Sequence, residues 1–101
     1  MNKLRLFSDP PSFDEVYPRN HTAIEGVNVT LHCKVTAANP EPNITWYRVT
    51  PNITALSNGE NLTFSSNSRS DAGQYYCMAE NGIDRAVSSR ISFIDVQCKY
   101  R

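Results

Sequence analysis

The sequence predicts an all-β fold built as an antiparallel sandwich of two sheets, and three observations carry that prediction. Apolar and polar residues alternate from residue 27 to residue 35, which is typical of a strand with one buried face. No ten-residue stretch shows the periodicity of an amphipathic helix. Cys33 and Cys77 flank the only tryptophan, Trp46, and the run before Cys77 reads Asp-Ala-Gly-Gln-Tyr-Tyr. This arrangement is typical of a two-layer sandwich.

The first half of the chain contains three expected strands. Residues 13–25 read as an edge strand broken at Pro18, because proline offers no N–H group to a strand ladder. Residues 27–35 form the next strand, strand B, and residues 39–42 are a proline-containing loop. Strand C is expected over residues 43–49.

The second half begins with an irregular crossing over residues 51–58, for which a short C′ strand and a short D strand are alternatives. An Asn-Gly pair then favours a turn. Strand E follows over residues 61–65, and a corner over residues 68–73 leads into strand F. A second Asn-Gly pair opens a hairpin to strand G, over residues 86–96. The side chains expected to face the core are Val27, Val29, Leu31, Cys33, Val35, Ile44, Trp46, Leu62, Phe64, Tyr75, Cys77, Ala79, Ile91 and Phe93.

Several further motifs accompany the cysteines. They are Glu25-Gly26 before strand B, Trp46-Tyr47-Arg48 in strand C, Leu62-Thr63-Phe64 in strand E and Ala79-Glu80-Asn81 after strand F. With these motifs, residues 12–97 resemble an immunoglobulin-superfamily domain of the C2 or I type. The resemblance implies an immunoglobulin-like sandwich with sheets A-B-E(-D) and C-F-G. The short distance between the cysteines leaves no room for the extra C′ and C″ strands of a variable-type domain.

The same resemblance implies roles for individual residues. A disulfide between Cys33 and Cys77 would join strands B and F, and the Tyr75 hydroxyl would bond to backbone at the E–F turn. Asn67 departs from the family pattern, which has an apolar residue there, and Asp84 stands where many I-type domains have glycine. The residues implied to specify the fold are Trp46, Tyr75, Asp71 and Gly73.

Composition narrows the function. Ten basic residues balance ten acidic ones, which argues against a nucleic-acid partner, and no apolar run approaches the length of a membrane helix. The N-terminus lacks the features of a complete signal peptide. Five Asn-x-Thr sequons indicate an exported, extracellular glycoprotein, although threonine is also favoured in strands for its own sake. The sequon asparagines are Asn20, Asn28, Asn43, Asn52 and Asn61.

No catalytic or metal site is expected, and no cofactor. His21 and His32 have no third ligand, and no serine has a base and an orienting acid around it. Cys98 is the odd cysteine. It would pair in a neighbouring domain, bridge a dimer or remain a reactive thiol.

The domain organisation is predicted from the two ends. Residues 1–12 read as the end of a preceding sandwich running into a proline-containing linker. Residues 13–97 form the domain itself, and residues 98–101 are a tail. We therefore expect the chain to come from a tandem array of such domains.

The outward face of strands C, F and G is the candidate binding surface. Tyrosine, methionine and arginine are enriched at the centres of protein interfaces, although an ordinary sheet surface is the alternative. By alternation this face should present Thr45, Tyr47, Gln74, Tyr76, Met78, Glu80, Arg90 and Ser92, of which Tyr47, Tyr76, Met78, Glu80 and Arg90 are the candidates for contact.

The resemblance implies extracellular adhesion through homophilic or heterophilic protein contacts. The alternatives are a ligand-binding or spacer domain of a growth-factor-type receptor and, against the sequons, an intracellular muscle-type domain.

Overall fold

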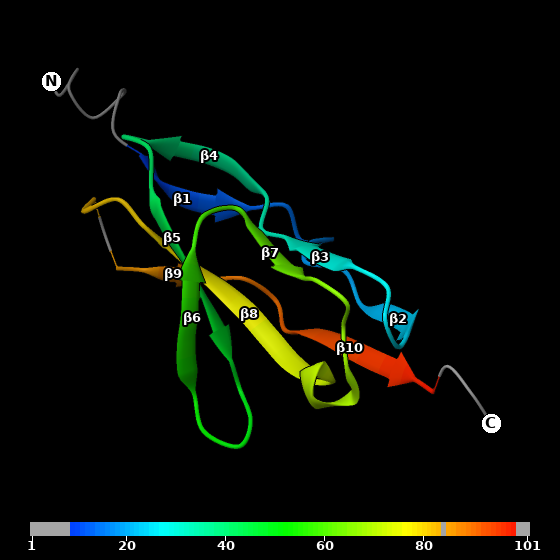
Figure 1. Cartoon of the computed structure of the whole chain (residues 1–101). Helices are drawn as coiled ribbons and strands as arrows, with labels where there is room; N and C mark the ends of the chain where they lie inside the picture. Colours follow the sequence, from blue (N-terminus) through cyan, green and yellow to red (C-terminus); the bar gives the residue numbers. More distant parts are fainter. Residues whose placement is uncertain (1–8, 84, 99–101) are drawn as a thin grey trace, which may run out of the picture.

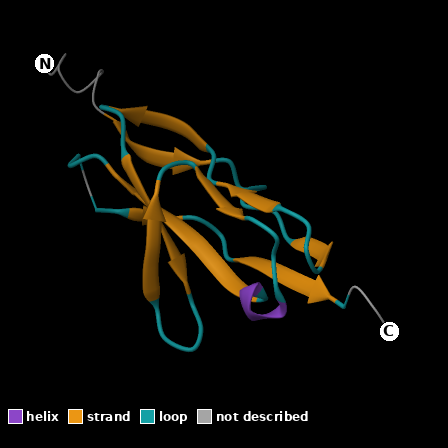
Figure 2. Ribbon diagram, viewed as in Figure 1, coloured by secondary structure: helices purple, strands orange, loops and turns teal. Residues whose placement is uncertain are grey.

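The computed structural model describes residues 9–83 and 85–98, and these form a sandwich of two β layers (Figure 1). Within these residues the strands are accompanied by one short 3-10 turn, η2 (Arg69–Asp71) (Figure 2). The strands are β1 (Asp9–Phe13), β2 (His21–Ile24), β3 (Val29–His32), β4 (Val35–Asn39), β5 (Asn43–Arg48), β6 (Thr54–Asn58), β7 (Asn61–Phe64), β8 (Gly73–Glu80), β9 (Val87–Ser88) and β10 (Ser92–Gln97).

One layer is a single sheet with the order β2-β10-β8-β5-β6, in which β9 also pairs with β8. The other layer consists of two strand pairs, β1-β4 and β3-β7. All of these pairs are antiparallel except β2 and β10, which run parallel. The predicted fold class, a two-sheet sandwich with one disulfide between Cys33 and Cys77, is therefore confirmed.

The N-terminal strand breaks near Pro18, as predicted, but its two halves join different layers. β1 pairs with β4, and β2 lies beside β10 in the opposite sheet. The expected A-B-E(-D) sheet is thus wrong for β2. The chain crosses between the layers at this break, where Pro18 is fully buried.

Residues 9–12 were expected to belong to a linker, and this expectation is wrong. Asp9 lies opposite Asn39 in β1, and Pro11 is buried. The Asn81 side-chain amide donates to the Asp9 carbonyl at 2.7 Å and so ties β1 to the end of β8. Residues 1–8, and the expected preceding domain with them, lie outside the described part of the chain, as do Asp84 and the tail beyond Cys98.

Strand B is divided into β3 and β4 and extends beyond residue 35. Val27 was expected to face the core, but 46% of its surface is exposed. The reason is local, because Val27 belongs to the turn before β3. Its carbonyl accepts the backbone N–H of Asn67, and its own N–H donates to the Ile24 carbonyl.

A strand at the C′ position is present, contrary to the argument from cysteine spacing. β6 pairs with β5 along Thr45–Asn58 and Arg48–Thr54, and it forms the outer edge of its sheet. Every residue of β6 is exposed. The connection from residue 49 to residue 53 is long enough to turn the chain back, and the layers need no further spacing between the cysteines.

The core lies between the layers. Most of the predicted inward side chains are buried, and Val35 and Phe64 pack against the core while remaining partly exposed. Besides Val27, the exceptions are Ile91 and Phe93, with exposed fractions of 43% and 49%. The buried core side chains are Val29, Leu31, Cys33, Ile44, Trp46, Leu62, Tyr75, Cys77, Ala79 and Ile94.

Strand G is broken and shifted by one residue relative to the prediction. β9 ends at Ser88 and β10 begins at Ser92, where Ser92 and Ile94 point inward in place of Ile91 and Phe93. The register is fixed by polar contacts. The Ser92 hydroxyl donates to the Arg19 carbonyl at 2.7 Å, and the Phe93 backbone N–H donates to Asn20 Oδ1 at 3.0 Å.

Candidate functional site

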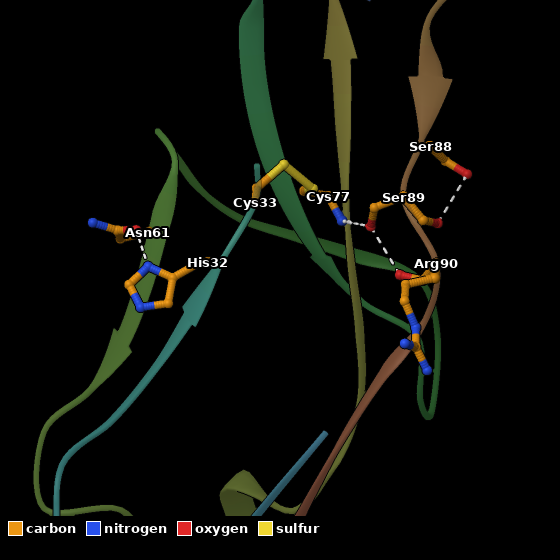
Figure 3. Close-up of a disulfide and its surroundings, with 7 residues drawn as sticks. All are labelled: His32, Cys33, Asn61, Cys77, Ser88, Ser89 and Arg90. Carbon is orange, nitrogen blue, oxygen red and sulfur yellow. Dashed lines mark hydrogen bonds between the residues drawn. A yellow bond between two sulfur atoms is a disulfide. The ribbon is translucent and has the colours of Figure 1, made fainter. Parts of the chain in front are cut away.

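The disulfide lies at the centre of the core. Cys33 and Cys77 are bonded and have exposed fractions of 2% and 0%. Ser89 holds strand G against this position, since its hydroxyl accepts the Cys77 backbone N–H at 3.0 Å and donates to the Arg90 carbonyl at 2.8 Å (Figure 3). Trp46 pairs with Cys77 across β5 and β8 and is fully buried. These residues hold the two layers together.

The corner before β8 contains a buried tyrosine. Tyr75 is fully buried, and its hydroxyl donates to the Asp71 carbonyl at 2.6 Å. The Asp71 carboxylate accepts the Ser68 backbone N–H at 2.8 Å, which closes the turn. Burial raises the pKa of Tyr75, the Arg48 guanidinium opposes that rise, and Asp71 adds to it. The neutral hydroxyl is therefore kept as a donor.

Gly73 is required by the same corner. Its φ is +153°, and a Cβ atom there would lie 3.2 Å from Arg48 Nη2. That guanidinium donates to the Ala72 carbonyl at 2.8 Å, so it has a fixed position. The structure therefore gives Asp71, Gly73 and Tyr75 the positions that the resemblance implied, and Arg48 is an additional member that sequence reasoning missed.

The five sequon asparagines are all exposed. Three of them use the side-chain oxygen as an acceptor: Asn20 from the Phe93 N–H, Asn28 from the Ser66 N–H at 2.9 Å, and Asn61 in a 2.7 Å hydrogen bond with His32 Nδ1. Because a sugar is attached to the nitrogen, these contacts are compatible with modification.

The outer face of β5, β8 and β10 carries a cluster of large side chains, which we call the tyrosine face. Tyr47 and Tyr76 are cross-strand partners with stacked rings, whose centroids are 5.3 Å apart and whose planes make an angle of 19°. Phe93 joins them, because it pairs with Gln74 on the same face. The members of the tyrosine face are Thr45, Tyr47, Gln74, Tyr76, Met78 and Phe93, with Glu80 at its end.

Two residues predicted for this face lie elsewhere. Ser92 is fully buried, because β10 has the opposite register from the expected one. Arg90 is exposed, but it precedes β10 and its guanidinium donates to the Val16 carbonyl at 3.4 Å, in the connection between β1 and β2. Glu80 is exposed at the end of β8, opposite Asn43. Phe93 is the member that sequence reasoning missed.

The histidines and Cys98 form no recognisable centre. His32 bonds to Asn61, and burial, followed by the charge of His32, lowers the pKa of His21. Within residues 9–83 and 85–98 no group of three candidate ligands could hold a metal ion. Cys98 is exposed and forms no disulfide with another described residue, and Arg69 Nη2 donates to its sulfur. None of the described helices is long and apolar enough to cross a membrane.

Comparison with known proteins agrees with this geometry. Residues 10–81 match the family described as immunoglobulin domain. The chain is 39% identical over 75 residues to IgLON family member 5 of Homo sapiens, covering 74% of this chain and 21% of that protein. It is 32% identical over 87 residues to Lachesin of Drosophila melanogaster, covering 82% and 24%. The chain thus spans about a fifth of the length of these relatives.

A solved structure extends the comparison to a complex. The structure of Dpr2 Ig1–Ig2 in complex with DIP-Theta Ig1–Ig3 matches with a TM-score of 0.72 and 34% sequence identity. The match covers 86% of this chain and 32% of that chain.

Proposed function

Because this chain belongs to the immunoglobulin-domain family, we propose that it is an extracellular module of a cell-surface adhesion protein and binds another protein through the tyrosine face. The observation that carries the proposal is the stacked pair Tyr47 and Tyr76 beside Phe93, which is 49% exposed. Aromatic side chains dominate the energetics of protein interfaces, because they bury much apolar area with little loss of conformational entropy.

The distribution of sequons supports the same face. Asn61 lies on β7, and Asn28 directly precedes β3, both in the opposite layer. Glycans there would cover that layer and leave the centre of the tyrosine face accessible, whereas glycans on Asn43 and Asn52 would lie at its edge. The relatives support the partner class, since the Dpr2 structure is a complex between two chains with Ig domains.

The domain would work within a longer chain. We propose that further immunoglobulin domains neighbour this one, with its own boundary before β1 and after β10, and that Cys98 pairs outside it. Weak single contacts would then gain strength from repetition along and between chains. In this proposal the domain has no catalytic role and needs no cofactor. A purely spacing role is the second candidate, and it is favoured by the number of exposed sequons.

Binding assays with matched variants distinguish these two roles. Beads coated with the secreted chain test homophilic contact, and a panel of immunoglobulin ectodomains displayed on cells tests heterophilic contact. We expect Tyr76→Ala to weaken binding about 30-fold, because truncating a central aromatic anchor costs about 2 kcal/mol. Arg90→Ala is the control, since Arg90 is exposed away from the tyrosine face.

Arg90→Ala should leave the free energy of unfolding unchanged to within about 0.5 kcal/mol. Tyr76→Ala should lower it by about 0.5–1.5 kcal/mol, because the stacking contact with Tyr47 is lost, and both chains should remain folded in the binding assay. Binding that survives both Tyr76→Ala and Phe93→Ser would overturn the role of this face. Absence of any binding by the wild-type chain would favour the spacing role.

A further inference from the structure

A groove of about 710 Å³ opens between the two layers at one edge of the sandwich. Four consecutive residues of β4, Val35 to Ala38, line one wall. Because side chains alternate between the two faces of a strand, consecutive lining residues mean that the groove runs along the edge of β4. The opposite wall is formed by the start of β5 and the turn from Asn58 to Glu60. The volume lies within the roughly 300–1,000 Å³ of sites that hold a small organic ligand.

Both flanking strands have an unpaired edge. Among the described residues β4 pairs only with β1, and β6 pairs only with β5. Such an edge presents backbone N–H and carbonyl groups that can pair with another molecule. The groove therefore offers backbone hydrogen-bonding groups as well as side chains.

The lining favours a neutral ligand rich in hydroxyl groups. Ala37 and Pro42 provide small apolar surfaces, Asn58 provides an amide, and Glu41 and Glu60 provide acceptors. Two carboxylates disfavour an anionic ligand. Sugars fit this combination, because a pyranose ring has apolar C–H faces and a rim of hydroxyl donors.

The groove also contains an attachment point for a sugar. Asn43 is exposed and is the sequon asparagine of this lining, and Thr45 of the same sequon lies in the same wall. We propose that Asn43 carries an N-linked glycan whose first two sugars lie in this groove and cover the unpaired strand edge. This inference rests on the extracellular location proposed above.

The modification needs a lipid-linked diphospho-oligosaccharide as donor. The Asn43 side-chain nitrogen forms a bond to the anomeric carbon, the bond from that carbon to the diphosphate breaks, and the amide gives up one proton. The sugar is then tethered at the rim of the groove. Its effective concentration there is high, so weak contacts are enough to hold it.

An added β-strand from another protein is the competing occupant of the edge. The sequon favours the glycan, because a bulky sugar on Asn43 would obstruct an incoming strand. Covering an unpaired edge is also a recurrent way to prevent edge-to-edge aggregation.

The test compares two sequons in the secreted chain. Asn52 is the matched control, since it is exposed in the connection between β5 and β6 and does not line the groove. Glycopeptide mass spectrometry measures occupancy, and timed endoglycosidase digestion of the native protein measures access to each core. We expect Asn43 to be occupied and its glycan to be released about tenfold more slowly than the glycan on Asn52. A tenfold ratio corresponds to a docked state of the glycan favoured by about 1.4 kcal/mol. After denaturation the two rates should be equal.

A second measurement separates docking from local crowding. Asn43→Gln should lower the melting temperature of the glycosylated chain and leave that of the enzymatically deglycosylated chain unchanged, whereas Asn52→Gln should change neither. An unoccupied Asn43 beside an occupied Asn52, or equal release rates, would overturn the inference. So would a dimer of the wild-type chain, glycosylated at Asn43 and joined through β4, which would identify a strand as the occupant. These outcomes and the binding test of Tyr76 have separate readouts, so either proposal can fail without the other.

Discussion

Replacing Tyr75 by phenylalanine removes a single hydroxyl from the core and tests the role of the corner before β8. The hydroxyl donates to the Asp71 carbonyl at 2.6 Å, and Tyr75 is fully buried. The ring should stay in place, because its edge-to-face contact with Phe64, with centroids 5.2 Å apart, needs no hydroxyl. The loss is then one hydrogen bond, with the Asp71 carbonyl left without its donor. We expect a destabilisation of about 1–1.5 kcal/mol.

Urea unfolding at pH 7, followed by the fluorescence of the buried Trp46, measures this change in the free energy of unfolding. For a domain of this size, 1 kcal/mol corresponds to a fall in melting temperature of about 4–8 °C. Tyr76→Phe is the matched control, because it removes a hydroxyl from the adjacent, partly exposed residue and should change stability by less than about 0.5 kcal/mol. Equal stabilities for both variants would refute the argument that the hydrogen bond contributes.

The pH dependence gives the same variant a second test. Burial is the main cause that raises the pKa of Tyr75 in the folded state. An unfolded tyrosine ionises at a pKa of about 10, so above that pH the unfolded chain releases a proton that the folded chain retains. Stability is therefore complete below pH 10 and is lost as pH rises through the folded pKa. The Tyr75→Phe chain should lose less stability above pH 10 than wild type, and parallel curves would contradict the assignment.

Three further substitutions probe other contacts by the same unfolding assay. Asn67→Ala should cost about 1–3 kcal/mol, because it removes two hydrogen bonds from the buried Asn67 amide to the Ile24 and Val27 carbonyls, each of which keeps a backbone donor, and a cost below about 0.5 kcal/mol would count against that role. Gly73→Ala should cost about 1–3 kcal/mol, since it combines a positive φ with a Cβ contact at 3.2 Å to Arg48, and a neutral effect would show that the corner relaxes. The pKa of His21 is lowered in the folded state, so its contribution to stability is present above pH 6.5 and is lost as pH falls through the folded pKa. His21→Gln should therefore lose less stability at acid pH than wild type, and identical pH curves would contradict this role of His21.

The sequence correctly predicted the positions of residues whose role in the fold can be filled by a single residue type. Cys33, Trp46, Cys77 and Tyr75 were located correctly because a disulfide, a large buried ring and a buried hydroxyl leave few alternatives at that spacing. Asn67 was identified as a departure from an apolar pattern, but its role was not. Its amide replaces apolar packing with hydrogen bonds to the carbonyls of the β2–β3 turn, and such long-range partners leave no local signal.

Strand pairing was harder to predict than strand existence. The parallel pairing of β2 with β10 joins segments about 70 residues apart, from Ile94–His21 to Gln97–Ile24, and no local pattern encodes it. β6 shows the same limit, because its residues are all exposed and lack the alternation that marks a half-buried strand. The candidate face was therefore predicted for β5 and β8, where alternation is clear, and was wrong for strand G.

Hydrophobic alternation did not predict the register of strand G, because this segment carries two competing apolar sets. Ile91 and Phe93 form one set, and Ile94 with Val96 forms another of the opposite parity, so the pattern alone does not choose. Polar contacts determine the register instead. The buried Ser92 hydroxyl donates to a carbonyl of the β1–β2 connection, and the Phe93 backbone N–H donates to the Asn20 side chain.

The register that buries Ser92 leaves Phe93 half exposed, so apolar area that the opposite parity would have removed from water stays in contact with it. That area lies on the same face as the stacked pair of Tyr47 and Tyr76. A partner that covers the tyrosine face would recover this burial at binding rather than at folding. We therefore expect Phe93→Ser to weaken binding while leaving the free energy of unfolding nearly unchanged, whereas Ile94→Ser, one residue away and buried, should destabilise the fold itself.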